Sequence, residues 1–169
     1  MYLIVALPSI RLTNLALALI CAGLMAYAFY SEKVLGLHPC PLCMSQRFFV
    51  VLVGALALIA FAHNPKSWGV KLYAALGVIA TVGGGIVAGR HLWIQSLPED
   101  QVPACGPSLE YILDTFPLGD ALMVLFRGDG NCAEVTWEFL GLSMPAWVLI
   151  AFVGLGFANL WQMLRKTAA

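Results

Sequence analysis

A pair of cysteines separated by two residues is the feature of the sequence best suited to chemistry. Cys40 and Cys43 stand in the segment HPCPLC. The C-x-x-C spacing allows a reversible disulfide, and the reactivity of its thiols depends on local charge. Pro41 and Leu42 lead into a predicted helix, whose N-terminus carries a partial positive charge that favours a thiolate at Cys43. The motif therefore predicts thiol and disulfide redox chemistry.

Other roles for the C-x-x-C motif remain open at this point. A structural disulfide or half of a zinc site would use the same spacing. A c-type haem link is disfavoured, because Met44 and not histidine follows Cys43. We expect no bound metal.

Three further cysteines fall into two classes. Cys105 and Cys132 lie in a long polar segment, and with the C-x-x-C pair they make an even number, which in an oxidising compartment indicates two disulfide pairs. Cys21 lies in the middle of an apolar run. We interpret it as a core residue, since a buried unpaired cysteine behaves as a small hydrophobe.

Two basic side chains could assist these thiols. Arg47 lies four residues after Cys43, on the same face of the predicted helix. A charge inside an apolar span is unfavourable and usually indicates a function or a buried partner, although Arg47 is close enough to the boundary to extend to the membrane interface instead. Arg90 and His91 end the third apolar segment at a similar depth. In a packed bundle they could converge near Cys43.

The composition shows which elements must position these residues. Of the 169 residues, 61% are hydrophobic and 11% charged, and mean hydropathy is +0.87, whereas soluble proteins contain about 25% charged residues. A membrane-spanning helix takes about 20 apolar residues. Four segments qualify, at about residues 12–30, 44–62, 71–89 and 142–164. We predict an all-α protein, a single integral membrane domain built as a four-helix transmembrane bundle.

The first apolar segment has a second interpretation. Arg11, the apolar run and the stretch from Ala26 to Ala28 resemble a signal peptide with its cleavage site. The run continues, however, through Phe29 and Tyr30, and the later spans need a first helix to pack against. We therefore predict an uncleaved span.

The second loop contains a short apolar stretch, and the third span contains closely spaced glycines. The loops are predicted at residues 31–43 and 90–141, and within the second lies PLGDALMVLFR, residues 117–127. This stretch is too short to span a bilayer and predicts a short helix on the membrane surface, or a cap on the bundle. In the third span, Gly85 and Gly89 have the G-x-x-x-G spacing that allows close helix packing.

The distribution of charge predicts the orientation, because Lys and Arg are enriched in short cytoplasmic segments. The two ends and the turn at residues 63–68 share one side, which holds Arg11, Lys66, Lys71, Arg165 and Lys166. All nine acidic residues fall in the two loops on the other side. Both termini are therefore predicted to be cytoplasmic and both loops extracytoplasmic. Membrane lipid is an expected partner, and nucleic acid is not.

At the level of motifs, the chain resembles a known family over essentially its whole length. The shared features are CPLC followed by Gln46 and Arg47, a cysteine pair in the second outer loop, and NCAEVTWEFLGLSMPAW from Asn131 to Trp147. They are similar to those of the disulfide bond formation protein B (DsbB) family of membrane oxidoreductases.

The resemblance implies an activity. A chain of this family in a bacterial inner membrane would reoxidise a soluble periplasmic thiol oxidase of the DsbA type and pass the electrons to the membrane quinone pool, with ubiquinone or menaquinone as acceptor. A DsbA-type partner is a strong oxidant, at about −120 mV, so its electrons need a still stronger acceptor. A lipid-soluble quinone meets that need.

By the same similarity, roles can be assigned to individual residues. The resemblance implies that electrons pass in the order Cys105, Cys132, Cys40 and Cys43. Arg47 would lie beside the quinone, which Cys43 faces, and His91 is a weaker candidate for the same site. Two alternatives remain. One is a sibling oxidase that serves a dedicated partner, and the other is a non-enzymatic scaffold braced by two structural disulfides.

Overall fold

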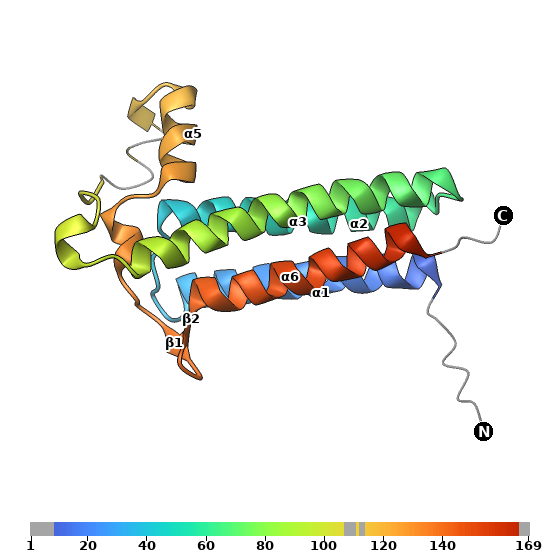
Figure 1. Ribbon diagram of the computed structural model, residues 1–169, viewed down its shortest axis with the longest axis horizontal. Helices are drawn as coiled ribbons and strands as arrows, with labels where there is room; N and C mark the ends of the chain where they lie inside the picture. The colour runs from blue at the N-terminus through green and yellow to red at the C-terminus, as the bar shows by residue number, and fades with distance from the viewer. Residues whose placement is uncertain (1–8, 107–110, 112–113, 166–169) are drawn as a thin grey trace.

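Four long helices run side by side in an elongated bundle (Figure 1). The computed structural model describes residues 9–106, 111 and 114–165. Each of the four helices is long and apolar enough to cross a membrane, which confirms the four predicted spans. Their bounds are α1 (Ile10–Lys33), α2 (Pro41–His63), α3 (Trp68–Gln95) and α6 (Met144–Leu164).

Local sequence signals explain where these helices begin. The Ser9 side chain accepts a hydrogen bond from the backbone N–H of Leu12, which caps the start of α1. In α2 the Cys40 sulfur has the same capping role, and Pro41 occupies the first turn. Pro145 likewise lies in the first turn of α6, as predicted, because proline there removes no helical hydrogen bond.

Helices α3 and α6 pack closely at two glycines. A Cβ atom at Gly84 would lie 2.3 Å from the ring of Phe152, and one at Gly77 would lie 2.3 Å from Asn159 Oδ1. The glycines of the G-x-x-x-G spacing, Gly85 and Gly89, do not make this close approach. A Cβ at Gly85 would make one ordinary contact, at 3.9 Å, and a Cβ at Gly89 would face open space. Close approach therefore occurs on the neighbouring face of α3, which the G-x-x-x-G spacing did not predict.

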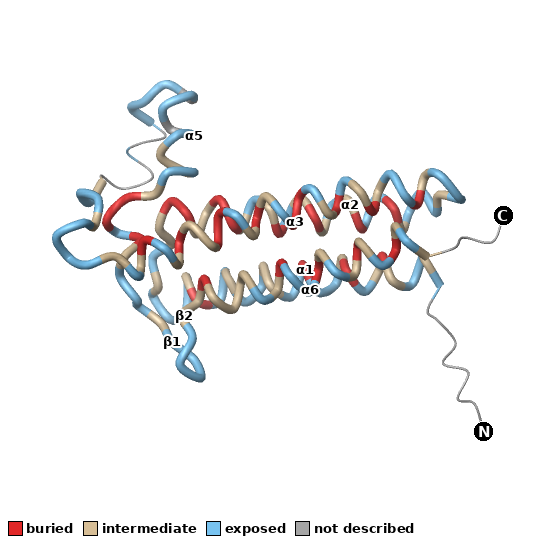
Figure 2. Tube along the Cα trace, in the orientation of Figure 1, coloured by how far each residue is buried: buried red, intermediate tan, exposed pale blue. Residues whose placement is uncertain are grey.

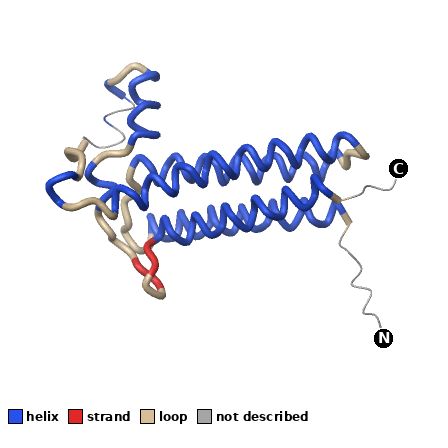
Figure 3. The backbone as a smooth tube through the Cα atoms, viewed as in Figure 1, coloured by secondary structure: helices blue, strands red, loops and turns tan. Residues whose placement is uncertain are grey.

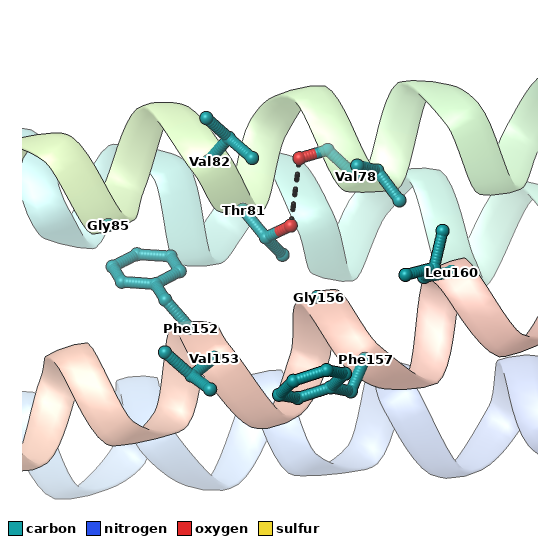
Figure 4. A pocket seen from close by; sticks show the side chains of 9 residues that line it. All are labelled: Val78, Thr81, Val82, Gly85, Phe152, Val153, Gly156, Phe157 and Leu160. Atoms are coloured by element: carbon teal, nitrogen blue, oxygen red, sulfur yellow. Dashed lines mark hydrogen bonds between the residues drawn. The ribbon is translucent and has the colours of Figure 1, made fainter.

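Burial follows the interior of the bundle (Figure 2). Cys21 is 2% exposed and packs in the main core with Val53 and Phe152, which confirms it as a core residue. Many large apolar side chains of the four helices are exposed, as expected of surfaces that meet lipid. On the outer side of α3 and α6 lies an apolar groove of about 300 Å³, between Val78 and Leu160 (Figure 4).

The second loop carries short elements at one end of the bundle (Figure 3). A short helix, α5 (Leu118–Arg127), is confirmed within the predicted segment, and its axis crosses the direction of the bundle (Figure 1). Two 3-10 turns, η1 (Glu99–Gln101) and η2 (Gly130–Ala133), flank it in sequence. The antiparallel strands β1 (Glu138–Phe139) and β2 (Leu142–Ser143) were not predicted, and β2 occupies the first two residues expected in the fourth span.

The described ends of the chain lie together at the end of the bundle opposite to α5 and the strands (Figure 1). An even number of spans requires this arrangement, and the C-x-x-C motif lies with α5 at the other end. Glu110 and Lys166, which contribute to the predicted orientation, are outside the described residues.

Candidate redox site

The two thiols of the C-x-x-C motif meet at the first turn of α2. Cys40 Sγ lies 3.2 Å from Cys43 Sγ and accepts a hydrogen bond from the Cys43 backbone N–H at 3.4 Å. Capping brings this about, because the Cys40 side chain folds over the free N–H groups of the helix start. All five cysteines are thiols in this structure. The geometry is that of a dithiol able to close into a disulfide.

His91 of α3 joins this pair from across the bundle. Its Nε2 lies 3.8 Å from Cys40 Sγ, and the reactive atoms of His91, Cys40 and Cys43 all lie within 4.8 Å of one another. The imidazole is 3% exposed, and its Nδ1 lies 3.0 Å from Nε2 of Gln46. The Gln46 amide therefore fixes the ring, with Nε2 towards the sulfurs. The predicted convergence of His91 on the motif is present.

Cys132 reaches the same cluster from the second loop. It is 0% exposed and packs with Leu42 and Ile94. Cys40 packs against the cluster that contains Cys132, and the two thiols interact there. This contact lowers the pKa of Cys132 from 9.0 to about 7 and raises the pKa of Cys40, with the neighbouring Cys43 as a second cause of the rise. Cys40 thus holds the shared proton, and Cys132 carries thiolate character.

Cys105 lies at the edge of this cluster and is exposed. Two backbone segments, residues 103–106 and 129–132, run against each other here, and we call this contact the loop junction. In the loop junction the Gly130 N–H donates to the Ala104 carbonyl at 3.2 Å. A Cβ at Gly130 would clash with the backbone carbonyl oxygen of Pro103 and lie 3.0 Å from Cys105 Sγ, so glycine permits this close approach of the two segments. The junction brings an exposed thiol close to the segment of the buried Cys132.

Helix α5 is attached to the bundle beside the thiols. The Ser45 hydroxyl donates to the Leu125 carbonyl at 2.6 Å, and Arg90 Nε donates to the Arg127 carbonyl at 2.8 Å. Gly128 follows with a φ of +74°, in close contact with Leu42. These attachments hold the start of the loop junction against α2 and α3. Arg90 therefore holds the end of α5 and, unlike His91, does not contact the C-x-x-C motif.

Arg47 turns towards α1 and forms an ion pair with Glu32. Its Nη2 also donates to the Ala28 carbonyl at 3.1 Å, and its guanidinium lies 5.8 Å from the Phe29 ring centre. The side chain is 15% exposed. A half-buried acidic partner on α1 thus accounts for the charge in the span, and extension to the interface does not. Arg47 remains linked to the motif through Met44, whose sulfur its Nη1 reaches at 4.0 Å.

Three residues of the site were missed by sequence reasoning. Gln46 orients His91, Glu32 pairs with Arg47, and Asp129 lies buried beside Cys132. Glu32 had a detectable signal, because it is the one acidic residue of the first outer loop. Gln46 stands in the segment that carries the family resemblance and Asp129 lies three residues before Cys132, but the contact of Gln46 with His91 joins distant segments and has no local signal.

Comparisons with known proteins agree with this geometry. Residues 10–162 match the family described as disulfide bond formation protein DsbB. Disulfide bond formation protein B of Saccharophagus degradans is 55% identical over 163 residues, covering 96% of this chain and 98% of that protein. The protein of the same name from Nitrosococcus oceani is 54% identical over 146 residues, or 86% of each chain. The chain therefore belongs to the DsbB family of membrane oxidoreductases, which generate disulfides by reoxidising DsbA and passing the electrons to quinone.

Proposed function

We propose that this chain reoxidises a periplasmic DsbA-type thiol oxidase and delivers the electrons to a membrane quinone through a relay of four cysteines. The order of the relay is Cys105, Cys132, Cys40 and Cys43. One observation carries this order: the buried Cys132 lies in the cluster against which Cys40 packs, while Cys105 is exposed. A soluble partner can therefore reach the exposed thiol of the loop, and the buried thiol of the loop adjoins the motif.

The relay consists of balanced thiol and disulfide exchanges. In the oxidised protein, a thiolate of the partner attacks Cys105 in a Cys105–Cys132 disulfide and releases Cys132 as a thiolate. Cys132 then attacks Cys40 in the Cys40–Cys43 disulfide, which forms a Cys132–Cys40 disulfide and releases Cys43 as a thiolate. The second thiol of the partner resolves its bond to Cys105, so the partner leaves oxidised. The released Cys105 thiolate then attacks Cys132, which restores the Cys105–Cys132 disulfide and frees Cys40 as a thiolate beside Cys43.

The residues beside Cys43 fit a quinone. A planar ring with carbonyl oxygens needs a hydrogen-bond donor within an apolar, lipid-accessible surface. Arg47 supplies the donor, and the exposed rings of Phe29 and Phe48 supply apolar surface at the same end of α1 and α2. Bound quinone would supply the two-electron oxidation that restores the Cys40–Cys43 disulfide. Within this site Arg47 would bind and orient the ring, and His91 would hold a proton beside the sulfurs.

The relay also requires an orientation in the membrane. The cysteine cluster and α5 lie at the end of the bundle that carries the acidic loops, and the basic turn lies at the other end (Figure 1). The charge asymmetry supports an orientation in a bacterial inner membrane with the cluster in the periplasm and both termini in the cytoplasm. The exposed apolar residues of α5, among them Met123, suit a helix that lies on the membrane surface.

A quinone-reduction assay with a reduced DsbA-type protein as donor tests the proposal. The purified chain should reduce about one quinone for each donor dithiol oxidised, since both couples transfer two electrons. Cys105→Ser and Cys40→Ser should abolish this transfer, whereas Cys21→Ala should leave turnover nearly unchanged. Quinone reduction that persists in Cys105→Ser would exclude the loop as the entry point.

A further inference from the structure

Three side chains that can bind a metal meet at the outer end of α2 and α3. The ligand atoms of Cys40, Cys43 and His91 all lie within 4.8 Å of one another. Cys40 Sγ lies 3.2 Å from Cys43 Sγ and 3.8 Å from His91 Nε2. Around a tetrahedral Zn²⁺, with bonds of about 2.3 Å to sulfur and about 2.0 Å to nitrogen, neighbouring ligand atoms lie about 3.5–3.8 Å apart. The three side chains therefore lie close to the positions of zinc ligands.

Cys132 stands beside this group as a fourth ligand. It belongs to the buried cluster against which Cys40 packs, and its thiol interacts with the Cys40 thiol and with His91. Half of a zinc site was one role left open for the C-x-x-C motif, although no bound metal was expected from the sequence. His91 from α3 and Cys132 from the second loop supply the other half. Three cysteines and one histidine are a common ligand set of closed tetrahedral zinc sites.

Only the reduced protein can hold such a metal, because the thiolate and not a disulfide sulfur is the ligand. All five cysteines are thiols in this structure. In the relay proposed above, this fully reduced state forms once two donor dithiols have been oxidised and no quinone has removed the electrons. Cys40 and Cys43 are partly exposed, so a cation can reach them before it contacts the buried ligands.

We propose that the fully reduced protein binds one Zn²⁺ through Cys40, Cys43, His91 and Cys132, and that the bound zinc arrests quinone reduction. Binding transfers no electrons: four metal–ligand bonds form, and each ligand thiol that carries a proton releases it to solvent. The lone pairs of Cys40 and Cys43 are then engaged by the metal, so the two sulfurs cannot close into a disulfide. The arrest rests on the relay proposed above, whereas the binding does not.

The surroundings of the four ligands suit a cation. The Asp129 carboxylate lies 3.8 Å from Cys132 Sγ and adds negative charge beside the site. The Gln46 amide lies 3.0 Å from His91 Nδ1. A metal on Nε2 requires the imidazole proton on Nδ1, so the Gln46 amide would turn its oxygen towards that proton. A hydrogen-bond partner on the far nitrogen is usual for a histidine that binds a metal.

Equilibrium binding to the full-length protein tests the site. Protein that has been reduced and freed of reductant without oxygen is titrated with Co²⁺, whose visible spectrum reports tetrahedral thiolate coordination, and Zn²⁺ then displaces the Co²⁺. We expect one metal for each reduced chain and no such spectrum from the oxidised protein. Thermal unfolding provides a second measurement that needs no variant: Zn²⁺ should raise the Tm of the reduced protein alone, because only this form binds the metal.

Variants of the two ligands from outside the motif test the coordination. His91→Ala and Cys132→Ser should each weaken Zn²⁺ binding by more than about 100-fold, since loss of even an outer partner of a ligand costs about 10–100-fold. His63→Ala removes an exposed histidine at the other end of α2, and Cys21→Ala removes a buried thiol of the core. These two are the matched controls and should bind zinc with wild-type affinity.

The arrest is measured without a donor protein, since a donor dithiol would bind zinc as well. Reduced wild-type protein is mixed with quinone in the presence or absence of Zn²⁺, and the loss of quinone absorbance is followed. At free Zn²⁺ about 100 times the Kd, about 1% of the protein is free of metal, so quinone reduction should slow by about 100-fold. Addition of a chelator should restore the rate.

The outcomes separate the metal site from the relay. Metal bound equally by oxidised protein, a wild-type Zn²⁺ affinity in His91→Ala or Cys132→Ser, or full quinone reduction by zinc-saturated protein would each overturn the inference. If quinone is reduced normally and the reduced protein binds no metal, the inference fails and the relay stands. If metal binds but the metal-free protein does not reduce quinone, the proposed function is wrong, and the arrest with it.

Discussion

Arg47 of α2 and Glu32 of α1 form an ion pair near the outer end of the bundle, beside the C-x-x-C motif. The pair neutralises a charge that would otherwise be unfavourable in an apolar span. It also uses only part of the guanidinium, which has five N–H donors. With Nη1 on Glu32 and Nη2 on the Ala28 carbonyl, the planar group has a fixed direction beside Phe29.

This geometry predicts how Arg47 variants respond to quinone. Arg47→Lys keeps the charge but loses the planar fork, so it cannot bond α1 and a ring carbonyl together. We expect the apparent KM for quinone to rise by roughly tenfold in Arg47→Lys, the equivalent of one hydrogen bond of about 1.4 kcal/mol, and further in Arg47→Ala. Steady-state quinone reduction at varied quinone concentration measures this KM. A KM equal to wild type in both variants would remove Arg47 from the quinone site.

Glu32→Gln distinguishes orientation from charge. This variant keeps Arg47 and its positive charge but weakens the contact that directs it. The KM for quinone should rise less than in Arg47→Lys, and exchange between the partner and the loop cysteines should not change. Lys33, whose side chain is exposed and also pairs with Glu32, offers a control: Lys33→Gln should have no effect on KM.

The interaction between the Cys40 and Cys132 thiols predicts a pH dependence. Since the pKa of Cys132 is lowered to about 7, its thiolate should be present above pH 7 and lost as the pH falls below it. The thiolate absorbance near 240 nm, in reduced protein with Cys21, Cys43 and Cys105 replaced by Ala, measures this midpoint. Adding Cys40→Ala removes the donor and should move the midpoint upwards, towards 9.0. A midpoint that stays near 7 would show that Cys40 is not the cause.

Glycine packing predicts a difference in stability within α3. Gly84→Ala places a methyl group against the Phe152 ring, 2.3 Å away, and should lower the free energy of unfolding by about 1–3 kcal/mol. Gly89→Ala faces open space and should be neutral or slightly stabilising, because alanine favours helix more than glycine does. Thermal unfolding in detergent compares the stability of the two variants with that of wild type. Equal losses in both variants would mean that α3 and α6 do not meet at Gly84.

The sequence predicted those parts of this structure that follow from local patterns. Continuous apolar runs predicted the four spans, and Cys40 followed by proline predicted a thiol at a helix start. The contacts that complete the site depend on helix rotation and loop folding, which have no local signature. Hydropathy does not tell which face of α1 carries Glu32 towards α2. Nor does it place Cys132 beside Cys40, because that contact depends on the loop junction.

Orientation is the next prediction. Reporter fusions after His63 and at the C-terminus should behave as cytoplasmic, and a fusion near Glu110 as periplasmic. The reason is the asymmetry of charge in the sequence: the two ends and the turn near residues 63–71 hold five basic residues and no acidic one, and all nine acidic residues fall in the two predicted loops on the other side. A cytoplasmic signal from the fusion near Glu110 would place the cysteine cluster in a reducing compartment and contradict the relay.

The order of entry into the relay can be tested by trapping. Exchange proceeds through a mixed disulfide, so removing the resolving thiol should leave the partner attached. Cys132→Ser also removes the loop disulfide, and for this reason the loop pair is kept intact and a partner without its own resolving cysteine is used. Cys105 should be captured, because it is the exposed thiol of the loop junction while Cys132 is buried.

The same complex should contain a Cys132–Cys40 disulfide and a free Cys43 thiol, because the sulfur released from Cys105 lies in contact with Cys40. Peptide mapping of the trapped complex, with alkylation of free thiols after acid quench, identifies all three. Cys43→Ser is a useful companion variant: it leaves no Cys40–Cys43 disulfide to attack, so it tests whether capture at Cys105 needs the motif. Partner linked chiefly to Cys40 or Cys43 would mean that the loop pair is structural, since electrons would then enter at the bundle without passing through Cys105.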